Sequence, residues 1–325
     1  MKLDTYNITS MMATTSSSSS SSSSRRSSSS SRRQLLEPLC SPVLVVITIL
    51  VLSVVTVPIN GYISSRPITT TAFARSKLDG RTSSTSSLLM SSSSSSSSSS
   101  KYKKIFVAGG SKGVGHAIVT KLSERGTEVV ALVRSEKSKK ELDKIDGVTA
   151  ILGDAFDQKG VENAMDGCDA AITTLGGTTG DRRVDYEGNN NVIESAGILG
   201  VQRIILLTSI GCGSSKEAAP PAVFEVLKDV LEAKEKAENI LMDYYTNSNW
   251  SIIRPGGLVS EVMTGQAILT EDNKTIGSIH REDVADLVIK VLDSTNTERK
   301  ILSAVDPSIT SSVAVEGKVI PAFEL

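Results

Sequence analysis

The chain has 325 residues and a formal net charge of −1, but its charge is unevenly distributed. Residues 1–100 contain nine basic and three acidic residues, which leaves 26 basic and 33 acidic residues in the remaining 225. This division predicts a basic leader, residues 1–100, followed by a mildly acidic globular domain, residues 101–325, large enough for one core. The acidic balance of the domain argues against nucleic-acid binding, which needs a basic surface to neutralise phosphates.

The first hundred residues have the composition of a targeting leader. Serine runs such as 16–24 cannot bury enough apolar surface to fold. Residues 42–59 form an apolar segment that four arginines precede, which is the layout of a secretory signal. The length of this segment is near the lower limit for a membrane span, so a retained membrane anchor is the alternative. Residues 60–100 are rich in Ser and Thr and poor in acidic residues, as a plastid transit peptide is.

At the junction of these two segments stands Ala72-Phe73-Ala74. This triplet resembles the motif in bipartite plastid presequences of algae with complex plastids, in which a signal peptide precedes a transit peptide. The resemblance implies delivery to the plastid stroma, and it leaves the mature domain without a stable membrane span.

From residue 101 onward, apolar runs with β-branched residues alternate with segments of helical periodicity. Strands are expected at 104–108, 128–133, 149–152, 169–174, 203–208, 250–254 and 300–304. Helices are expected at about 114–125, 136–142, 159–166, 187–199, 222–243 and 281–293. This alternation predicts an α/β fold, a single-domain, doubly wound parallel sheet with helices on both faces. Ligands then bind along the carboxyl edge of the sheet.

A cluster of glycines follows the first predicted strand and opens the first predicted helix. We expect Gly109 to permit a sharp turn, Gly113 to let the backbone approach a pyrophosphate, and Gly115 to let helix and strand pack closely. The helix N-terminus adds free N–H groups and a positive dipole end. The pattern predicts a dinucleotide site formed by Gly109, Gly110, Ser111, Lys112, Gly113, Val114 and Gly115.

The choice of cofactor is made where the second strand ends. An NAD site usually has an acidic residue there, but this chain has Arg134, with Lys112 in the glycine loop. Because both cations are suited to a 2′-phosphate, NADP is expected rather than NAD. Asp154, beside Ala155, is placed to bind the adenine amine, and the alternative is an Asp that starts a loop or caps a helix. Further cofactor contacts are expected after the fourth strand, at Thr174, Leu175 and Gly176.

A series of motifs extends over residues 103–305: VAGGSKGVG (107–115), LGDAFD (152–157), ITTLGG (172–177), the segment 184–211, AKEKAEN (233–239), IIRPGGL (252–258) and IHREDVA (279–285). Taken together, this series resembles the atypical, NmrA-like branch of the short-chain dehydrogenase/reductase superfamily. The resemblance implies a Rossmann-like NAD(P)-binding fold. It also implies either reductase activity or NADP sensing, because the branch includes flavin, biliverdin and chlorophyll-pathway reductases and members that have lost catalysis.

The Tyr-dependent enzymes of that superfamily have a Tyr four residues before a Lys. An Ala-Glu pair often follows that Lys, and Ala237-Glu238 matches this pair in the present chain. The match places Lys234 at the lysine position and Val230 at the tyrosine position. Since valine cannot donate a proton, an ordinary alcohol dehydrogenase is disfavoured. Hydride transfer to a delocalised acceptor, such as a flavin, tetrapyrrole or quinone, makes a weaker demand for an acid. An NADPH-dependent reductase is therefore expected, and the alternative is a non-catalytic redox sensor or plastid assembly factor with a protein partner.

Two residues are the catalytic candidates. Ser209, after the fifth strand, is placed to hydrogen-bond the acceptor or the cofactor. Lys234 is placed to bind the nicotinamide ribose hydroxyls, or else it belongs to a solvated face of a helix rich in Lys and Glu. The backbone of Pro255 and Gly256 is expected to line the nicotinamide pocket, and the alternative is a tight turn with Arg254 in an internal ion pair.

The remaining features bound the chemistry without naming a substrate. Cys40, Cys168 and Cys212 lack the spacing of metal ligands, which predicts reduced thiols and no metal site. Substrate contacts are expected from 211–222 and 257–278, which are rich in loop-forming residues and contain no cluster of aromatic side chains.

Overall fold

A computed structural model describes residues 101–177, 181–309 and 319–325. The apolar segment 42–59, the transit-like segment and Cys40 therefore lie outside the described residues, and the division at residue 100 stays a prediction. In the part of the chain that is described, no helix is both long enough and apolar enough to cross a membrane.

The main sheet has eight strands in the order β3-β2-β1-β4-β5-β6-β10-β8. All neighbouring strands pair in parallel except β8, which runs antiparallel to β10. The order reverses between β1 and β4, as in a doubly wound sheet, which confirms the predicted fold class. The strands are β1 (Lys104–Ala108), β2 (Glu128–Val133), β3 (Val148–Leu152), β4 (Ala170–Thr173), β5 (Arg203–Leu207), β6 (Asn249–Pro255), β8 (Ile268–Thr270) and β10 (Lys300–Val305).

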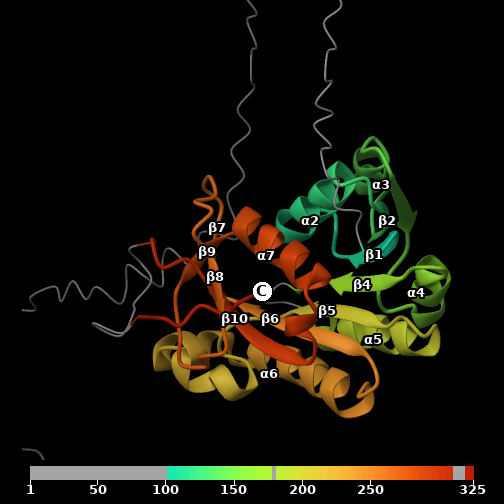
Figure 1. The fold of residues 1–325 in the computed structure, drawn as a ribbon. Helices are drawn as coiled ribbons and strands as arrows, with labels where there is room; N and C mark the ends of the chain where they lie inside the picture. The colour runs from blue at the N-terminus through green and yellow to red at the C-terminus, as the bar shows by residue number, and fades with distance from the viewer. Residues whose placement is uncertain (1–100, 178–180, 310–318) are drawn as a thin grey trace, which may run out of the picture. The chain divides into compact units, whose positions relative to one another are not determined.

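Helices cover both faces of this sheet (Figure 1). The helices are α2 (Gly113–Glu124), α3 (Glu136–Leu142), α4 (Gln158–Met165), α5 (Asn189–Ile198), α6 (Pro221–Tyr244) and α7 (Arg281–Asp293). Residues of α2, α3 and α7 share one buried cluster, and residues of α4, α5 and α6 share the other. Successive side chains of β1 alternate between them: Ile105 and Val107 belong to the first, Phe106 and Ala108 to the second.

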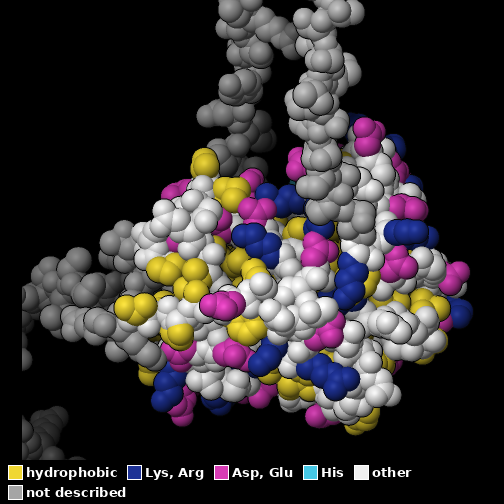
Figure 2. All heavy atoms as spheres, in the orientation of Figure 1, with side chains coloured by type: hydrophobic (Ala, Val, Ile, Leu, Met, Phe, Trp, Pro, Cys, Tyr) yellow, Lys and Arg dark blue, Asp and Glu magenta, His cyan; other side chains and the backbone are white. Residues whose placement is uncertain are grey.

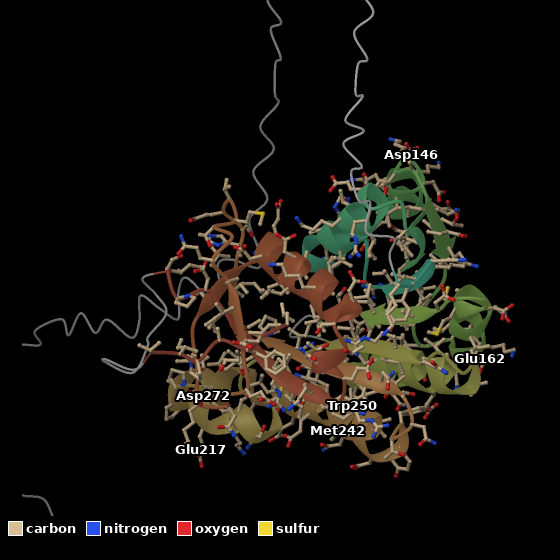
Figure 3. All side chains as sticks on the ribbon, in the orientation of Figure 1. Asp146, Glu162, Glu217, Met242, Trp250 and Asp272 are labelled. Atoms are coloured by element: carbon tan, nitrogen blue, oxygen red, sulfur yellow. The ribbon has the colours of Figure 1, made fainter. Side chains whose placement is uncertain are left out.

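The second cluster shows how the helices are held against the sheet. Trp250 of β6 is buried in it, and Met242 of α6, labelled close to Trp250 in Figure 3, packs against it. On the outer surface, Lys, Arg, Asp and Glu side chains are interspersed over the face drawn in Figure 2, without a continuous basic area.

The sequence analysis did not predict several short strands and helical turns in the connecting segments. β7 (Gly257–Val259) and β8 lie within 257–278, the stretch expected to be rich in loop, and β9 (Ser278–His280) begins at its last residue. β7 and β9 form a parallel two-stranded sheet, whereas β8 lies at the edge of the main sheet. A single turn of π-helix, η1 (Val184–Gly188), precedes α5, and two 3₁₀ turns, η2 (Gly213–Ala218) and η3 (Thr295–Thr297), occur later. Three-residue strands carry too little periodicity to be recognised.

Candidate functional site

The glycine loop packs too tightly for side chains. Gly109 and Gly113 have φ angles of +87° and +60°, in the left-handed region that favours glycine. A Cβ on Gly115 would lie 2.3 Å from the carbonyl oxygen of Gly109 and 2.6 Å from Oγ1 of Thr174. Thr174 itself donates that hydroxyl to the carbonyl of Ala108 at 3.1 Å. The start of α2 therefore packs closely against the end of β1, as the glycine pattern predicted, and the end of β4 lies against both.

The N-terminus of α2 is open to a ligand. No described side chain caps it, and Lys112 at the N-cap position has no acceptor to offer. The first N–H groups of a helix lack partners inside the helix, and with the dipole they attract phosphate. Gly110 is buried, and a Cβ there would lie 2.9 Å from Cγ2 of Val119. These features fit a dinucleotide diphosphate, while the contacts of Ser111, Val114 and the rest of the loop with a cofactor stay predictions.

The next two strands end in residues predicted to contact the adenosine part. Arg134 is exposed directly after β2. Asp154 is also exposed, and its Oδ1 accepts the N–H of Phe156 at 3.1 Å, which matches the loop-starting alternative. Ala155 is buried, and its carbonyl accepts the side-chain amide of Asn191 at 2.8 Å. The end of β3 is thereby tied to α5.

The side chain of Lys234 is turned into the protein rather than toward solvent. Its Nζ lies 2.8 Å from Oδ1 of Asp185, and the two side chains are 12% and 0% exposed. Nζ also donates to the carbonyl of Leu175 at 3.3 Å. A Cβ on Gly176 would lie 3.6 Å from the same Nζ. The ammonium group is therefore held at the carboxyl end of β4, against the segment predicted to contact the cofactor.

Asp185 and Asn189 were missed by the sequence analysis. Asp185 lies on the π-helical turn η1, and its Oδ2 accepts the N–H of Gly177 at 2.9 Å. Asn189 is fully buried; its Oδ1 accepts the hydroxyl of Thr173 at 2.6 Å and its amide donates to the carbonyl of Asp185 at 3.0 Å. In the sequence both residues stand inside the motif segment 184–211, and nothing there distinguishes them from their neighbours. Single turns of π-helix occur often at functional sites.

A second buried ion pair lies at the end of β6. Arg254 donates to both carboxylate oxygens of Glu238, from Nε at 3.0 Å and from Nη2 at 2.6 Å. The hydroxyl of Thr208 donates to Glu238 Oε1 at 2.6 Å, and Ser214 accepts from Arg254 Nη1 at 2.8 Å. The internal ion pair considered as an alternative is therefore present.

The backbone at Pro255 and Gly256 is engaged inside the protein. The carbonyl of Pro255 accepts the N–H of Ile210, and the N–H of Gly256 donates to Ala304. A Cβ on Gly256 would lie 2.1 Å from the carbonyl oxygen of Gly277, which explains the glycine by packing. A role for either residue in the nicotinamide pocket stays a prediction.

The hydroxyl of Ser209 already has a hydrogen-bond partner inside the protein, and the thiol of the nearby Cys212 is buried. The Ser209 hydroxyl donates to the carbonyl of Ile210 at 3.0 Å. Within the described residues, Ser209 and Lys234 form no hydrogen bond with each other. Burial raises the pKa of the Cys212 thiol to about 12 and that of Cys168 to about 11, so both are protonated near neutral pH. Neither thiol is therefore suited to act as a nucleophile.

Three buried residues offer the geometry of metal ligands: His280, Asp283 and Asp306, whose ligand atoms lie within 4.8 Å of one another. The carboxylate of Asp283 accepts the N–H groups of Thr264 and Gly265, both at 3.0 Å. Burial opposes the ionisation of Asp306, but hydrogen bonds from Ser308 and Thr264 and the nearby His280 lower its pKa overall. Because these oxygens already serve protein donors, the cluster is explained as a structural tie between β9, α7 and the end of β10.

A family model described as NAD(P)H-binding matches residues 109–295. This chain belongs to that NAD(P)H-binding family. The matched range begins at the first glycine of the loop and includes Lys234, Glu238 and the segment that starts α7. Membership in the family makes NAD(P)H the cofactor of this chain.

Individual relatives in the family carry different names. The chain is 33% identical over 204 residues to an uncharacterised sugar epimerase of Bacillus subtilis, a match that covers 61% of this chain and 91% of that protein. It is 30% identical over 218 residues to a chloroplastic protein of Arabidopsis thaliana, covering 63% and 77%. Among solved structures, an anaerobillin reductase from Escherichia coli O157:H7 matches with a TM-score of 0.58 and 27% identity, covering 63% of this chain and 98% of that one.

Proposed function

We propose that this chain is an NADPH-dependent reductase that passes a hydride to an acceptor able to delocalise charge, of the flavin, tetrapyrrole or quinone type. The observation that carries the proposal is the ammonium group of Lys234, held by the buried Asp185 at the end of β4. One helical turn earlier stands Val230, which has no proton to give. A reduced nicotinamide, when bound, supplies the hydride.

The chain's own residues then act by binding and orienting. The N-terminus of α2 receives the diphosphate, and Lys234 donates hydrogen bonds to the ribose hydroxyls next to the nicotinamide. Burying a charged pair costs desolvation energy, so a buried ion pair contributes little to stability. The pair of Asp185 and Lys234, which holds an ammonium group at the carboxyl edge of the sheet where ligands bind, is therefore better explained by function. Without a positioned acid, the acceptor must tolerate the incoming charge itself.

Preference for NADP over NAD rests on Arg134. This residue is exposed directly after β2, where an acid would bind the ribose of NAD, and Lys112 is exposed in the glycine loop. A guanidinium group binds phosphate in a bidentate manner, which favours the 2′-phosphate of NADP. The name of the Escherichia coli relative, a reductase, supports the reaction, whereas the epimerase name of the Bacillus subtilis protein points to a different one.

The test is calorimetry with NADPH followed by a screen of flavins, quinones and tetrapyrroles with the purified chain. We expect NADPH binding and NADPH oxidation with at least one acceptor class. Lys234→Met should weaken both. Its matched control is Lys236→Met on the same helix, because Lys236 is exposed and its ammonium group lies over the ring of Tyr186. A chain that binds NADPH and oxidises it with none of the acceptors would refute the reductase.

That result would leave the second candidate, a non-catalytic redox sensor or assembly factor. It is favoured by Val230 together with Ser209, whose hydroxyl already donates to a neighbouring carbonyl. A sensor should capture a protein partner in a pull-down, and the amount captured should differ between the NADP-bound and the NADPH-bound chain. Steady turnover with any acceptor excludes a purely sensing role.

We also propose that residues 1–100 deliver the domain 101–325 to the plastid stroma. The basic, Ser-rich leader supports this address, as does the chloroplastic name of the Arabidopsis thaliana relative. A fluorescent fusion of residues 1–100 should enter the plastid. Secretion or plasma-membrane fluorescence would contradict the address, and recovery of the uncleaved chain with membranes would favour an anchor at 42–59.

A further inference from the structure

The arginine of the IHREDVA motif lies beside the glycine loop. Arg281 is the first residue of α7, directly after β9. A Cβ placed on Gly113 would lie 3.8 Å from Cδ and 3.9 Å from Nε of Arg281. Helices α2 and α7 lie side by side on one face of the sheet (Figure 1), so the first residues of the two helices are neighbours.

Only part of the Arg281 guanidinium is used inside the protein. Its Nη1 donates to the carbonyl of Leu258 at 3.4 Å and to the hydroxyl of Ser260. No described residue accepts a hydrogen bond from Nε or Nη2, and no described carboxylate forms an ion pair with this side chain. A cavity of about 480 Å³ is lined by Gly113, His116 and Arg281, and also by Glu124, Glu261 and Glu282. The guanidinium group is thus a cation with free donors next to an uncapped helix N-terminus.

The segment that carries Arg281 is firmly anchored. His280, just before it, is buried with its Nδ1 3.4 Å from Oδ2 of Asp283. Asp283, two residues after Arg281, accepts two backbone N–H groups from the loop after β7. A donor on such a support loses little conformational freedom when it binds a ligand, which is what an affinity-determining contact requires.

We propose that Arg281 binds the diphosphate of the dinucleotide at the N-terminus of α2, as a clamp supplied from outside the glycine motif. The proposal deepens the NADPH-binding site of the proposed function and rests on it. It also gives the IHREDVA motif a role that hydride transfer alone leaves unexplained. An arginine suits this role because its planar fork binds phosphate oxygens in pairs.

The test compares three ligands on the full chain: NADPH, ADP-ribose 2′-phosphate and adenosine 2′-monophosphate, the last of which lacks the diphosphate. Arg281→Met should weaken the first two by about 10- to 100-fold, the loss expected for charge-assisted hydrogen bonds, and leave the third unchanged. Arg281→Lys, which keeps the charge but not the planar guanidinium group, should bind NADPH with an affinity between those of the wild type and Arg281→Met. Arg125→Met is the matched control, because Arg125 pairs with Asp293 near the other ends of the same two helices.

Unchanged NADPH affinity in Arg281→Met would overturn the proposal, and so would an equal loss for all three ligands, which would indicate a structural role. If Arg281→Met does not fold, Arg281→Lys with a wild-type urea midpoint decides the same comparison. Failure of the reductase is a separate outcome: a wild-type chain that binds NADPH without turnover leaves the Arg281 contact intact.

Discussion

The pair formed by Asp185 and Lys234 allows the sharpest test of the site. Asp185→Asn keeps the size of the side chain and an oxygen for the N–H of Gly177, which Asp185 now accepts at 2.9 Å. It removes the charge that lies 2.8 Å from Nζ of Lys234. The variant therefore leaves the ammonium group of Lys234, whose side chain is only 12% exposed, without its counterion.

Breaking a buried ion pair by removing one partner costs about 3–5 kcal/mol. We expect the lower end, about 3 kcal/mol, because Nζ keeps the carbonyl of Leu175 and some contact with water. With a urea m-value of about 2 kcal/mol/M, the unfolding midpoint should fall by about 1.5 M. Replacing Lys234 by Met in the Asp185→Asn background removes the orphaned charge, so the double variant should recover much of the loss.

The assay is a double-mutant cycle from urea unfolding curves, with NADPH affinity measured on each folded variant. A coupling energy of about 1–3 kcal/mol is expected for residues in direct contact. Effects that add to within about 0.5 kcal/mol would refute the pair as a unit. A midpoint for Asp185→Asn within 0.3 M of wild type, a margin of roughly 0.6 kcal/mol, would refute its burial energetics.

Three further predictions concern the cofactor choice, the glycine loop and the buried thiol of Cys212. Arg134→Ala should weaken NADP binding by about 10- to 100-fold and leave NAD binding unchanged; equal NADP binding by calorimetry would remove Arg134 from the site. Gly115→Ala places a Cβ 2.3 Å from a carbonyl oxygen and should abolish NADPH binding or folding, whereas Gly126→Ala, at φ +74° with open space around it, should cost only about 1–2 kcal/mol by urea unfolding. Burial raises the pKa of Cys212 from 9.0 to about 12, so above pH 9 the unfolded chain ionises first and stability should fall toward pH 12; Cys212→Ala should flatten that fall.

The periodic elements could be predicted because each is buried in a way that repeats along the chain. The predicted ranges of β1, β2 and α7 agree with the structure residue for residue, since each is marked in the sequence by a run or stripe of apolar side chains that are buried in the fold. Gly126, with the N–H of Thr127 donating to Leu122, ends α2 in the manner expected of a glycine there. β7, β8 and β9 were missed because strands of three residues are selected by tertiary pairing.

The residues of the candidate site likewise divide into those set by a local sequence pattern and those set by tertiary contacts. The glycine loop is contiguous in sequence, so its close packing could be anticipated from spacing alone. Asp185, Asn189 and Arg281 could not be, because each acquires its role only from a contact made by folding: with Lys234, with the end of β4, and with Gly113. Sequence reasoning weighed a nicotinamide-pocket role for the backbone after Arg254 against a tight turn with Arg254 in an internal ion pair, and only the position of Glu238 in the fold identified the partner of that ion pair.

The spacing on α6 explains how the carboxyl edge is assembled. Lys234 and Glu238 are four residues apart and therefore lie on the same face of the helix. Lys234 pairs with Asp185 near the end of β4, while Glu238 pairs with Arg254 at the end of β6 and accepts a hydrogen bond from Thr208 after β5. One face of α6 thus joins the ends of three adjacent strands. In Tyr-dependent enzymes the same one-turn spacing carries Tyr and Lys; here it carries Lys and Glu one turn later, so at this edge α6 supplies positioned charges in place of a hydroxyl.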